Sequence, residues 1–93
     1  MEEKKIEAKL VKDAKKMKGL ALKWVSPGCN GVPDRIVLLP HGKIAFVELK
    51  ATGKKPRALQ IKRHEELRAL GFKVYVVDSY EGVTEVLNEV QAS

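Results

Sequence analysis

The segment 43–50 constrains the fold most strongly, because it reads as a buried β-strand that ends in two charged residues. Side chains alternate between the two faces of a strand, so Glu48 and Lys50 point the same way, together with Ile44 and Phe46. A carboxylate and an ammonium at the end of an apolar strand are costly to desolvate unless they are paired or serve a site. The segment therefore predicts either a strand that frays into solvent with a loose salt bridge, or a strand that carries a functional site.

A second carboxylate favours the functional site. Asp34 follows Pro33 at the entrance to another apolar run, residues 35–39, and precedes Glu48 by fourteen residues. Two short strands joined by a turn would bring both carboxylates beside Lys50. The alternative is that Asp34 only shapes the turn after the proline and that Glu48 only pairs with the lysine.

The 93 residues are enough for one small domain with a thin core, so we expect residues 1–93 to form a single domain. No apolar run reaches the roughly 20 residues needed to span a bilayer, and no apolar segment follows the charged N-terminus. The single Cys29 cannot form an internal disulfide, and with His41 and His64 it shows no zinc-ligand spacing. We therefore expect an intracellular, cytoplasmic protein with no membrane partner.

The formal charge of +6 favours a polyanionic partner, and nucleic acid is the commonest one. The charge is also concentrated just after the Glu-Lys pair, in Lys50, Lys54, Lys55, Arg57, Lys62 and Arg63. The alternative is a basic loop that is merely solvated.

The first half of the chain reads as one helix followed by three strands. Helical spacing of apolar residues predicts a helix over residues 2–18, which we expect Gly19 to end in a left-handed conformation. Strands are predicted at 20–25, 35–39 and 43–50, with a loop at 26–33 and a tight turn at 40–42.

The second half reads as helix, strand and helix. A helix is predicted over residues 57–70, with Gly71 as its stop, and a fourth strand at 73–77. Ser79 is expected to cap the final helix. The expected apolar sides are Leu59, Ile61, Leu67 and Leu70 in the first of these helices and Val83, Val86, Leu87 and Val90 in the second.

This order predicts an α/β fold with a mixed four-stranded sheet and helices on its faces. The first three strands can form an antiparallel meander, whereas the helical crossover to the fourth requires a parallel, right-handed connection. Sites in open α/β sheets tend to lie at strand ends where the topology changes, and Glu48 and Lys50 are at such an end.

Two carboxylates that converge near a lysine suit a hard divalent cation such as Mg²⁺, which takes oxygen ligands and keeps several waters. Such a cation lowers the pKa of a bound water and polarises a phosphoryl oxygen. Lys50 can orient or help deprotonate the attacking water and stabilise charge that builds up on the phosphate. The neighbouring basic residues can hold a nucleic-acid backbone.

The chain resembles the VRR-NUC branch of the PD-(D/E)xK nuclease superfamily. The resemblance rests on Gly-Val-Pro-Asp-Arg at 31–35, Phe-Val-Glu-Leu-Lys at 46–50 and Gln60 in the following helix, and it extends from Glu3 to about Leu87. It implies a restriction-endonuclease-like core in a stand-alone, minimal VRR-NUC domain, with Mg²⁺ or Mn²⁺ as cofactor.

The resemblance also implies roles for individual residues. Asp34 and Glu48 would be the metal-binding acids, with the carbonyl of Leu49 as a backbone ligand, and Lys50 would be the catalytic lysine. Gln60 would lie near the lysine and the metal-bound water; a glutamine beside an apolar stripe is otherwise usually solvated.

The family also places a glutamate of its first helix near the metal. Here Glu3 fits best and Glu7 is the alternative. Both acids have a simpler reading, because early acidic residues suit the positive end of the helix dipole.

Stand-alone members of this branch are similar to Holliday-junction resolvases in size and layout, which implies a homodimer on branched DNA. A two-fold dimer matches a pseudo-two-fold junction. No element predicts base-specific readout, so we expect recognition of shape and phosphate. The expected phosphate contacts are Ser26, Arg35, Lys54, Lys55, Arg57 and Arg63. Candidate interface residues are Trp24, Phe72 and Tyr75, although core packing is the preferred reading of each.

Three functions remain open from the sequence. The first is a Mg²⁺- or Mn²⁺-dependent endodeoxyribonuclease that cuts four-way junctions, flaps or single strands. The second is a non-cleaving nucleic-acid-binding module on a nuclease fold. The third is a structural domain whose acids and lysines merely pair. The joint occurrence of Asp34, Glu48, Lys50 and Gln60 favours the first.

Overall fold

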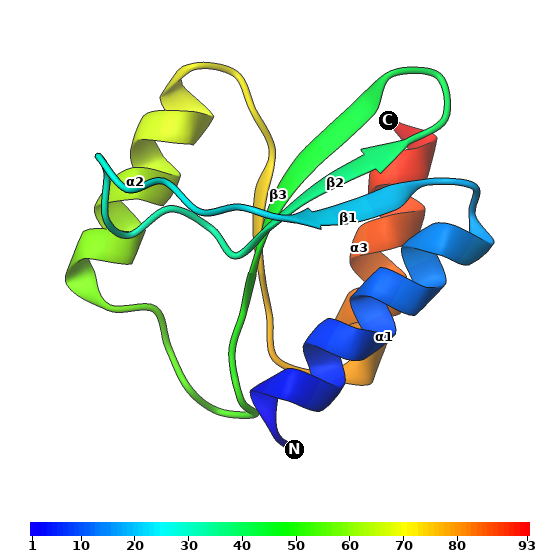
Figure 1. Ribbon diagram of the computed structural model, residues 1–93, viewed down its shortest axis with the longest axis horizontal. Helices are drawn as coiled ribbons and strands as arrows, with labels where there is room; N and C mark the ends of the chain where they lie inside the picture. Colours follow the sequence, from blue (N-terminus) through cyan, green and yellow to red (C-terminus); the bar gives the residue numbers. More distant parts are fainter.

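Seven elements build the fold in the order that the sequence predicts (Figure 1). The computed structural model describes all residues, 1–93. The elements are α1 (Glu3–Lys16), β1 (Leu20–Lys23), β2 (Arg35–Leu39), β3 (Lys43–Leu49), α2 (Ala58–Ala69), β4 (Val74–Val77) and α3 (Tyr80–Ala92). The predicted bounds differ from these by at most two residues at any end. No helix combines the length and the apolarity needed to cross a membrane.

The four strands form one mixed sheet in the order β1-β2-β3-β4. β1 pairs antiparallel with β2, and β2 with β3, whereas β3 and β4 are parallel. The turn between β2 and β3 spans three residues, 40–42, and has positive φ at both His41 (70°) and Gly42 (72°), the left-handed conformation that glycine adopts readily. The parallel pair is joined through α2, because parallel strands need a long crossover.

The main core lies between the sheet and the pair α1 and α3, which pack on one face, while α2 lies on the other (Figure 1). Ser79 caps α3 as predicted, accepting a hydrogen bond from the backbone N–H of Gly82 at 3.0 Å. The core is entirely apolar. Its members are Ile6, Leu10, Ala14, Ala21, Val37, Leu39, Ala45, Val47, Leu49, Val77, Val83, Val86, Leu87 and Val90.

The opposite face of the sheet is covered only in part. Near its centre, the ring of Phe46 packs against Trp24 at 5.1 Å and Phe72 at 5.5 Å between centroids. Farther from α2, the strand register aligns an apolar row across three strands, Leu20, Leu38 and Ile44. Leu20 and Ile44 in this row are exposed.

The predicted apolar side of α2 was wrong. Leu59, Ile61 and Leu70 are exposed and Leu67 is only half-buried, whereas the buried residues of this helix are Gln60 and His64. The reason is that α2 lies over the end of β3 where Glu48 points, so the side of α2 that faces the sheet is polar.

The predicted end of α1 was also wrong in detail. Lys18, not Gly19, takes the left-handed conformation, with φ of 66°. Gly19 is needed for a different reason, because a Cβ there would lie 2.3 Å from the carbonyl oxygen of Leu38. The glycine thus lets the chain turn closely past β2 before β1 begins.

Candidate active site

Glu48 is the centre of a polar cluster on the α2 side of the sheet, and only 1% of it is exposed. Its Oε2 accepts a hydrogen bond from Gln60 Nε2 at 2.8 Å and lies 3.4 Å from Lys50 Nζ. The Oε1 of Gln60 accepts in turn from the backbone N–H of Arg57 at 2.8 Å, as a residue in the first turn of a helix often does. The start of α2 therefore fixes Gln60, and Gln60 fixes the carboxylate.

Asp34 reaches the same end of the sheet from the residue before β2. Its Oδ2 accepts a hydrogen bond from the backbone N–H of Leu49 at 2.8 Å, between Glu48 and Lys50 in the chain. Its own carbonyl oxygen accepts from the N–H of Trp24 at 2.9 Å, which extends the pairing of β1 and β2 by one step. The two strands thus bring both carboxylates to the end of β3.

The environment of Glu48 disfavours its charged form. Burial is the largest cause and the nearby charge of Asp34 the second, and together they raise the pKa of Glu48 from 4.5 to about 7 against the opposing effect of Lys50. A single ammonium therefore does not balance the two carboxylates. A cation at this place would supply the missing positive charge.

His64 is a member of this cluster that the sequence analysis missed. It lies on α2 one turn after Gln60, is 2% exposed, and its Nε2 is 3.8 Å from Oε1 of Glu48. Both atoms are buried without a hydrogen-bond partner. Burial, with the charges of Arg68 and Lys50, lowers the pKa of His64 below its usual range, which favours the neutral imidazole. The available signal was the spacing of four from Gln60, which puts both side chains on one face of a helix.

The two first-helix acids differ in what they contact. Glu7 Oε2 pairs with Arg35 Nε at 2.8 Å, and Arg35 also donates to the carbonyl oxygen of Ala21 at 3.0 Å. Glu3 is exposed, and its charge contributes to the raised pKa of Glu48. Because Glu7 is held by Arg35 and the charge of Glu3 reaches Glu48, Glu3 is the better candidate for the first-helix acid.

The expected phosphate-binding residues fall into two groups. Lys54, Lys55 and Arg57 are exposed, and none has a carboxylate within 4.0 Å. Arg63 donates to the carbonyl oxygen of Asn30 at 2.8 Å and pairs with a glutamate on its own helix. Arg35 is held by the contacts described above. The two held arginines stabilise the loop 26–33 and β1, respectively.

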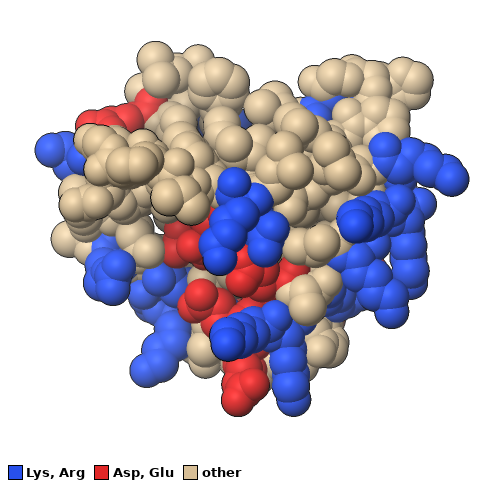
Figure 2. Space-filling view, in the orientation of Figure 1, with Lys and Arg blue, Asp and Glu red and all other residues tan.

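Ser26 is half-buried and lines a small, mainly apolar pocket of about 160 Å³ with Trp24, Leu67 and Leu70. Across the molecule, acidic side chains gather near the centre of one face, with basic side chains on both sides of them (Figure 2). A polyanion that approaches the acidic centre from either of these sides therefore meets basic side chains.

The residues of this cluster fit a hard divalent cation for which the protein supplies only some of the ligands. No three His, Cys, Asp or Glu side chains converge closely enough to hold a metal by themselves. The cluster offers instead two carboxylates, one of them with a buried oxygen that lacks any partner. This set suits Mg²⁺, which is usually bound through one or two carboxylates and completes its shell with water and substrate oxygens.

Comparison with known proteins identifies the family. No family profile matches the sequence. The chain is 53% identical over 79 residues to a protein described as "Putative nuclease p44" from Acyrthosiphon pisum secondary endosymbiont phage 1, covering 85% of each chain. A solved structure described as "VRR_NUC domain" superimposes with a TM-score of 0.86 at 33% identity, over 92% of this chain and 94% of the other. The four-stranded core with α1, α2 and α3 is thus that of a VRR-NUC domain, and the chain belongs to the VRR-NUC family of nucleases.

Proposed function

We propose that the protein is a Mg²⁺- or Mn²⁺-dependent DNA endonuclease that hydrolyses phosphodiester bonds at the cluster of Asp34, Glu48 and Lys50. The observation that carries this proposal is the Glu48 carboxylate, which is buried beside a second carboxylate and has one oxygen without a partner. Burying such a group costs stability, and metal binding in a nuclease site accounts for that cost.

The proposed ligands are Asp34, Glu48 and the carbonyl oxygen of Leu49. When bound there, the cation would lower the pKa of a coordinated water and neutralise charge on the phosphoryl group. Lys50 orients the attacking water and stabilises charge on the phosphate through its Nζ. Gln60 holds Glu48 in place through the 2.8 Å hydrogen bond, and Glu3 is the proposed first-helix acid of the site, because its charge raises the pKa of Glu48.

Lys54, Lys55 and Arg57 are our first choice for contacts with the DNA backbone, because their charged groups are exposed and unpaired. Arg35 and Arg63 already donate to groups of the protein, so we assign them a supporting role. Ser26, which lines the small pocket beside Trp24, is the remaining candidate for a phosphate contact. Contacts of this kind position a duplex without reading its sequence.

The partly uncovered face of the sheet supports a homodimer. Leu20, Leu22 and Ile44 are exposed on this face, and Phe72, whose ring packs on Phe46 of the same face, is exposed too. Exposed apolar side chains that share one face can mark an interaction site, and a second copy of the chain would bury them by two-fold symmetry. Such a dimer presents two cutting centres to two strands of a branched DNA. Of the residues considered earlier, Trp24 and Phe72 lie on this face, whereas Tyr75 packs against the main core.

The test is cleavage of a four-way junction beside linear duplex, flap and single-stranded DNA, with Mg²⁺, Mn²⁺ or EDTA. Paired, symmetric cuts in the junction that need the metal and are lost in Lys50→Ala would support a dimeric junction endonuclease. Cutting of flaps or single strands instead would keep the nuclease and remove the junction preference. DNA binding without cutting under any metal would favour the non-cleaving binding module.

The dimer is tested separately by light scattering coupled to gel filtration. An Ile44→Lys substitution places a charge in the exposed apolar row and should yield monomers. An equivalent Ile61→Lys change on the exposed side of α2 is the control, and it should leave the mass unchanged. A wild type that runs as a monomer at all concentrations contradicts the dimer.

A further inference from the structure

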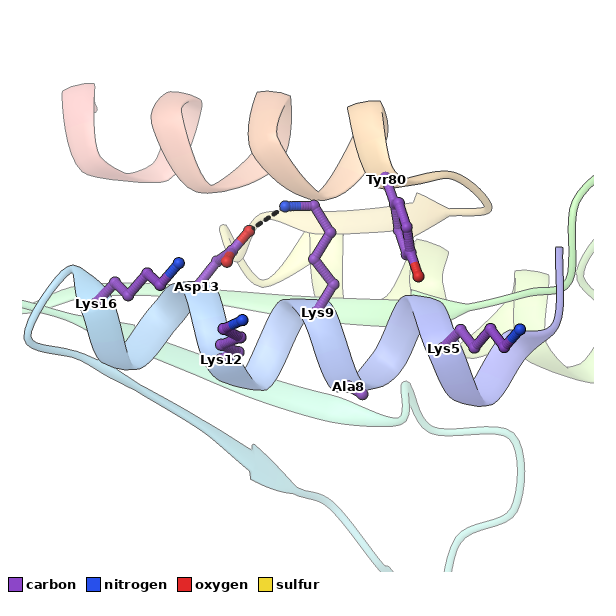
Figure 3. Close-up of a pocket in the computed structure, with 7 residues that line it drawn as sticks. All are labelled: Lys5, Ala8, Lys9, Lys12, Asp13, Lys16 and Tyr80. Carbon is purple, nitrogen blue, oxygen red and sulfur yellow. Dashed lines mark hydrogen bonds and ion pairs between the residues drawn. The ribbon is translucent and has the colours of Figure 1, made fainter.

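The largest groove of the molecule lies away from the cluster around Glu48, between α1 and α3, with a volume of about 420 Å³ (Figure 3). Four lysines of α1 follow one another along it at steps of four, three and four residues, which places them on one face of the helix. Tyr80 closes the groove from the start of α3. The principal lining residues are Lys5, Lys9, Lys12, Asp13, Lys16 and Tyr80.

The groove carries excess positive charge. Lys9 pairs with Asp13, and its Nζ also lies 5.7 Å from the centre of the Tyr80 ring. The other three ammonium groups have no carboxylate within 4.0 Å. Like charges in a row repel one another, so an arrangement of this kind is stabilised when an anion binds along it.

One end of the groove adjoins the loop that follows Lys50. Thr52 donates from its backbone N–H to the carbonyl oxygen of Met1 at 3.2 Å, which ties the loop after Lys50 to the start of α1. Gly53 N–H donates to Asp78 Oδ2 at 3.1 Å, just before α3. The loop that carries the exposed Lys54 therefore adjoins the end of the groove, and the basic surface continues from the loop along α1.

We propose that the α1 groove binds the phosphodiester backbone of the DNA segment that flanks the scissile phosphate. The inference rests on the proposed function and adds a second contact surface to it. The lysine row is about 16 Å long at 1.5 Å per residue of helix. DNA carries one phosphate per about 3.4 Å of duplex axis on each strand, so a row of this length can reach several phosphates on one face of the duplex.

A duplex fits this groove better than an anionic membrane does. A helix that lies on a membrane inserts an apolar face among the lipids. The apolar face of α1, formed by Ile6, Leu10 and Ala14, is fully buried against the sheet and α3. Only the lysine side of α1 is open to a partner, and it carries no large apolar side chains that could insert into a membrane.

The experiment compares two triple variants that remove the same charge. The groove variant is Lys5→Gln, Lys12→Gln and Lys16→Gln; the control is Lys15→Gln, Lys18→Gln and Lys73→Gln. All six lysines are exposed. Affinity for a fluorescently labelled DNA four-way junction is measured over a series of salt concentrations. EDTA is present throughout, so that no cutting occurs. Binding of the same proteins to phosphatidylserine vesicles is measured in parallel.

Each lost phosphate contact should lower the slope of log affinity against log salt by about 0.9. The groove variant should therefore lose between two and three units of slope and on the order of 10–100-fold in affinity at 0.1 M salt, while the control keeps nearly the wild-type slope. Equal losses in both variants, or none in either, would overturn the inference. So would unchanged DNA binding together with a loss of vesicle binding in the groove variant.

Failure of this inference is distinguishable from failure of the proposed function. If the wild type cuts DNA and the groove variant binds it normally, only the groove assignment is wrong. If the groove variant alone binds weakly but no metal supports cutting, the groove stands and the nuclease assignment falls. A wild type that binds no DNA even at low salt would overturn both.

Discussion

The two faces of the sheet are covered in different ways. On one face, α1 and α3 close a core in which every buried side chain is apolar. On the other, α2 covers the end of β3 with Gln60 and His64, and the buried residue beneath them is Glu48. The remainder of this second face is left partly open, with Leu20 and Ile44 exposed.

The apolar face of the sheet therefore serves mainly stability, whereas the polar face carries the candidate active site. Apolar burial on the first face supplies the main driving force for folding. The buried carboxylate on the second face opposes folding, because desolvation of a charge is costly and only one ammonium lies beside it. Substitutions on the two faces should therefore have opposite consequences for stability and cleavage.

The largest expected effect is on cleavage, from Glu48→Gln. The substitution keeps the shape of the side chain but removes the anionic ligand, so the cleavage rate should fall by at least about 10³-fold. The measurement is the single-turnover rate on the best substrate, beside the melting temperature in EDTA. Glu65→Gln is the control, because Glu65 is an exposed carboxylate on α2 with no ion pair. Full activity in Glu48→Gln would remove Glu48 from the site.

The second effect is on stability, from Leu10→Ala on the apolar face. Leu10 is fully buried, and its truncation should lower the free energy of unfolding by 2–5 kcal/mol. The folded fraction should cut at the wild-type rate. Leu70→Ala is the matched control on the α2 side, where Leu70 is 74% exposed, and it should change stability by less than about 0.5 kcal/mol. Urea denaturation measures both, and equal losses would contradict the contrast between the faces.

The apolar face was predictable from the sequence because periodicity reports burial directly. Ile6, Leu10 and Ala14 recur at helical spacing, and all are buried as expected. The order of elements and the parallel crossover followed from turn residues and connection lengths. Gly19 was assigned a wrong role because its close approach to Leu38 depends on tertiary packing, which local sequence does not encode.

The polar face was predictable only where spacing rules applied. The two carboxylates meet at one sheet end as expected, since the hairpin between β2 and β3 fixes their register. The orientation of α2 was not predictable from its own sequence, because leucines exposed on this helix resemble a core stripe. Burial of Gln60 and His64 follows from the polar residue they cover, which is a contact between distant parts of the chain.

The third effect is a pH dependence of stability. The pKa of Glu48 is raised from 4.5 to about 7, so the unfolded chain loses this proton before the folded chain does. The stability from the protonated carboxyl is therefore complete below about pH 4.5 and is lost as pH rises to about 7, by at most about 3 kcal/mol. The measurement is urea unfolding of wild type and Glu48→Gln in EDTA at pH 5 and pH 8.

The difference in stability between these two proteins should grow in favour of Glu48→Gln at the higher pH. Addition of Mn²⁺ at pH 8 should stabilise the wild type more than the variant, because a ligand that binds only the folded state raises its stability. Parallel pH curves for the two proteins would show that the carboxyl titrates normally.

The fourth effect is a smaller loss of metal affinity, from Gln60→Leu. The substitution removes the 2.8 Å hydrogen bond to Glu48 and also leaves the N–H of Arg57 without its acceptor. Residues that orient a metal ligand typically contribute 10–100-fold to affinity or activity, and we expect a loss in that range. Calorimetric titration with Mn²⁺ measures it without DNA. Gln91→Leu, at an exposed position near the C-terminus, is the control and should bind Mn²⁺ normally.

The smallest effect is expected from His64→Leu, which makes the polar face more like the apolar one. The Nε2 of His64 has no hydrogen-bond partner, and the 3.8 Å to Glu48 Oε1 is too long for a hydrogen bond. Replacing a buried polar group that makes no hydrogen bond should leave stability unchanged or raise it by up to about 1 kcal/mol, with a loss of cleavage below about tenfold. Urea unfolding and single-turnover rates measure both quantities. If His64→Leu instead loses as much Mn²⁺ affinity as Gln60→Leu, the imidazole contacts Glu48 when the metal binds, and both residues on this side of α2 orient the carboxylate.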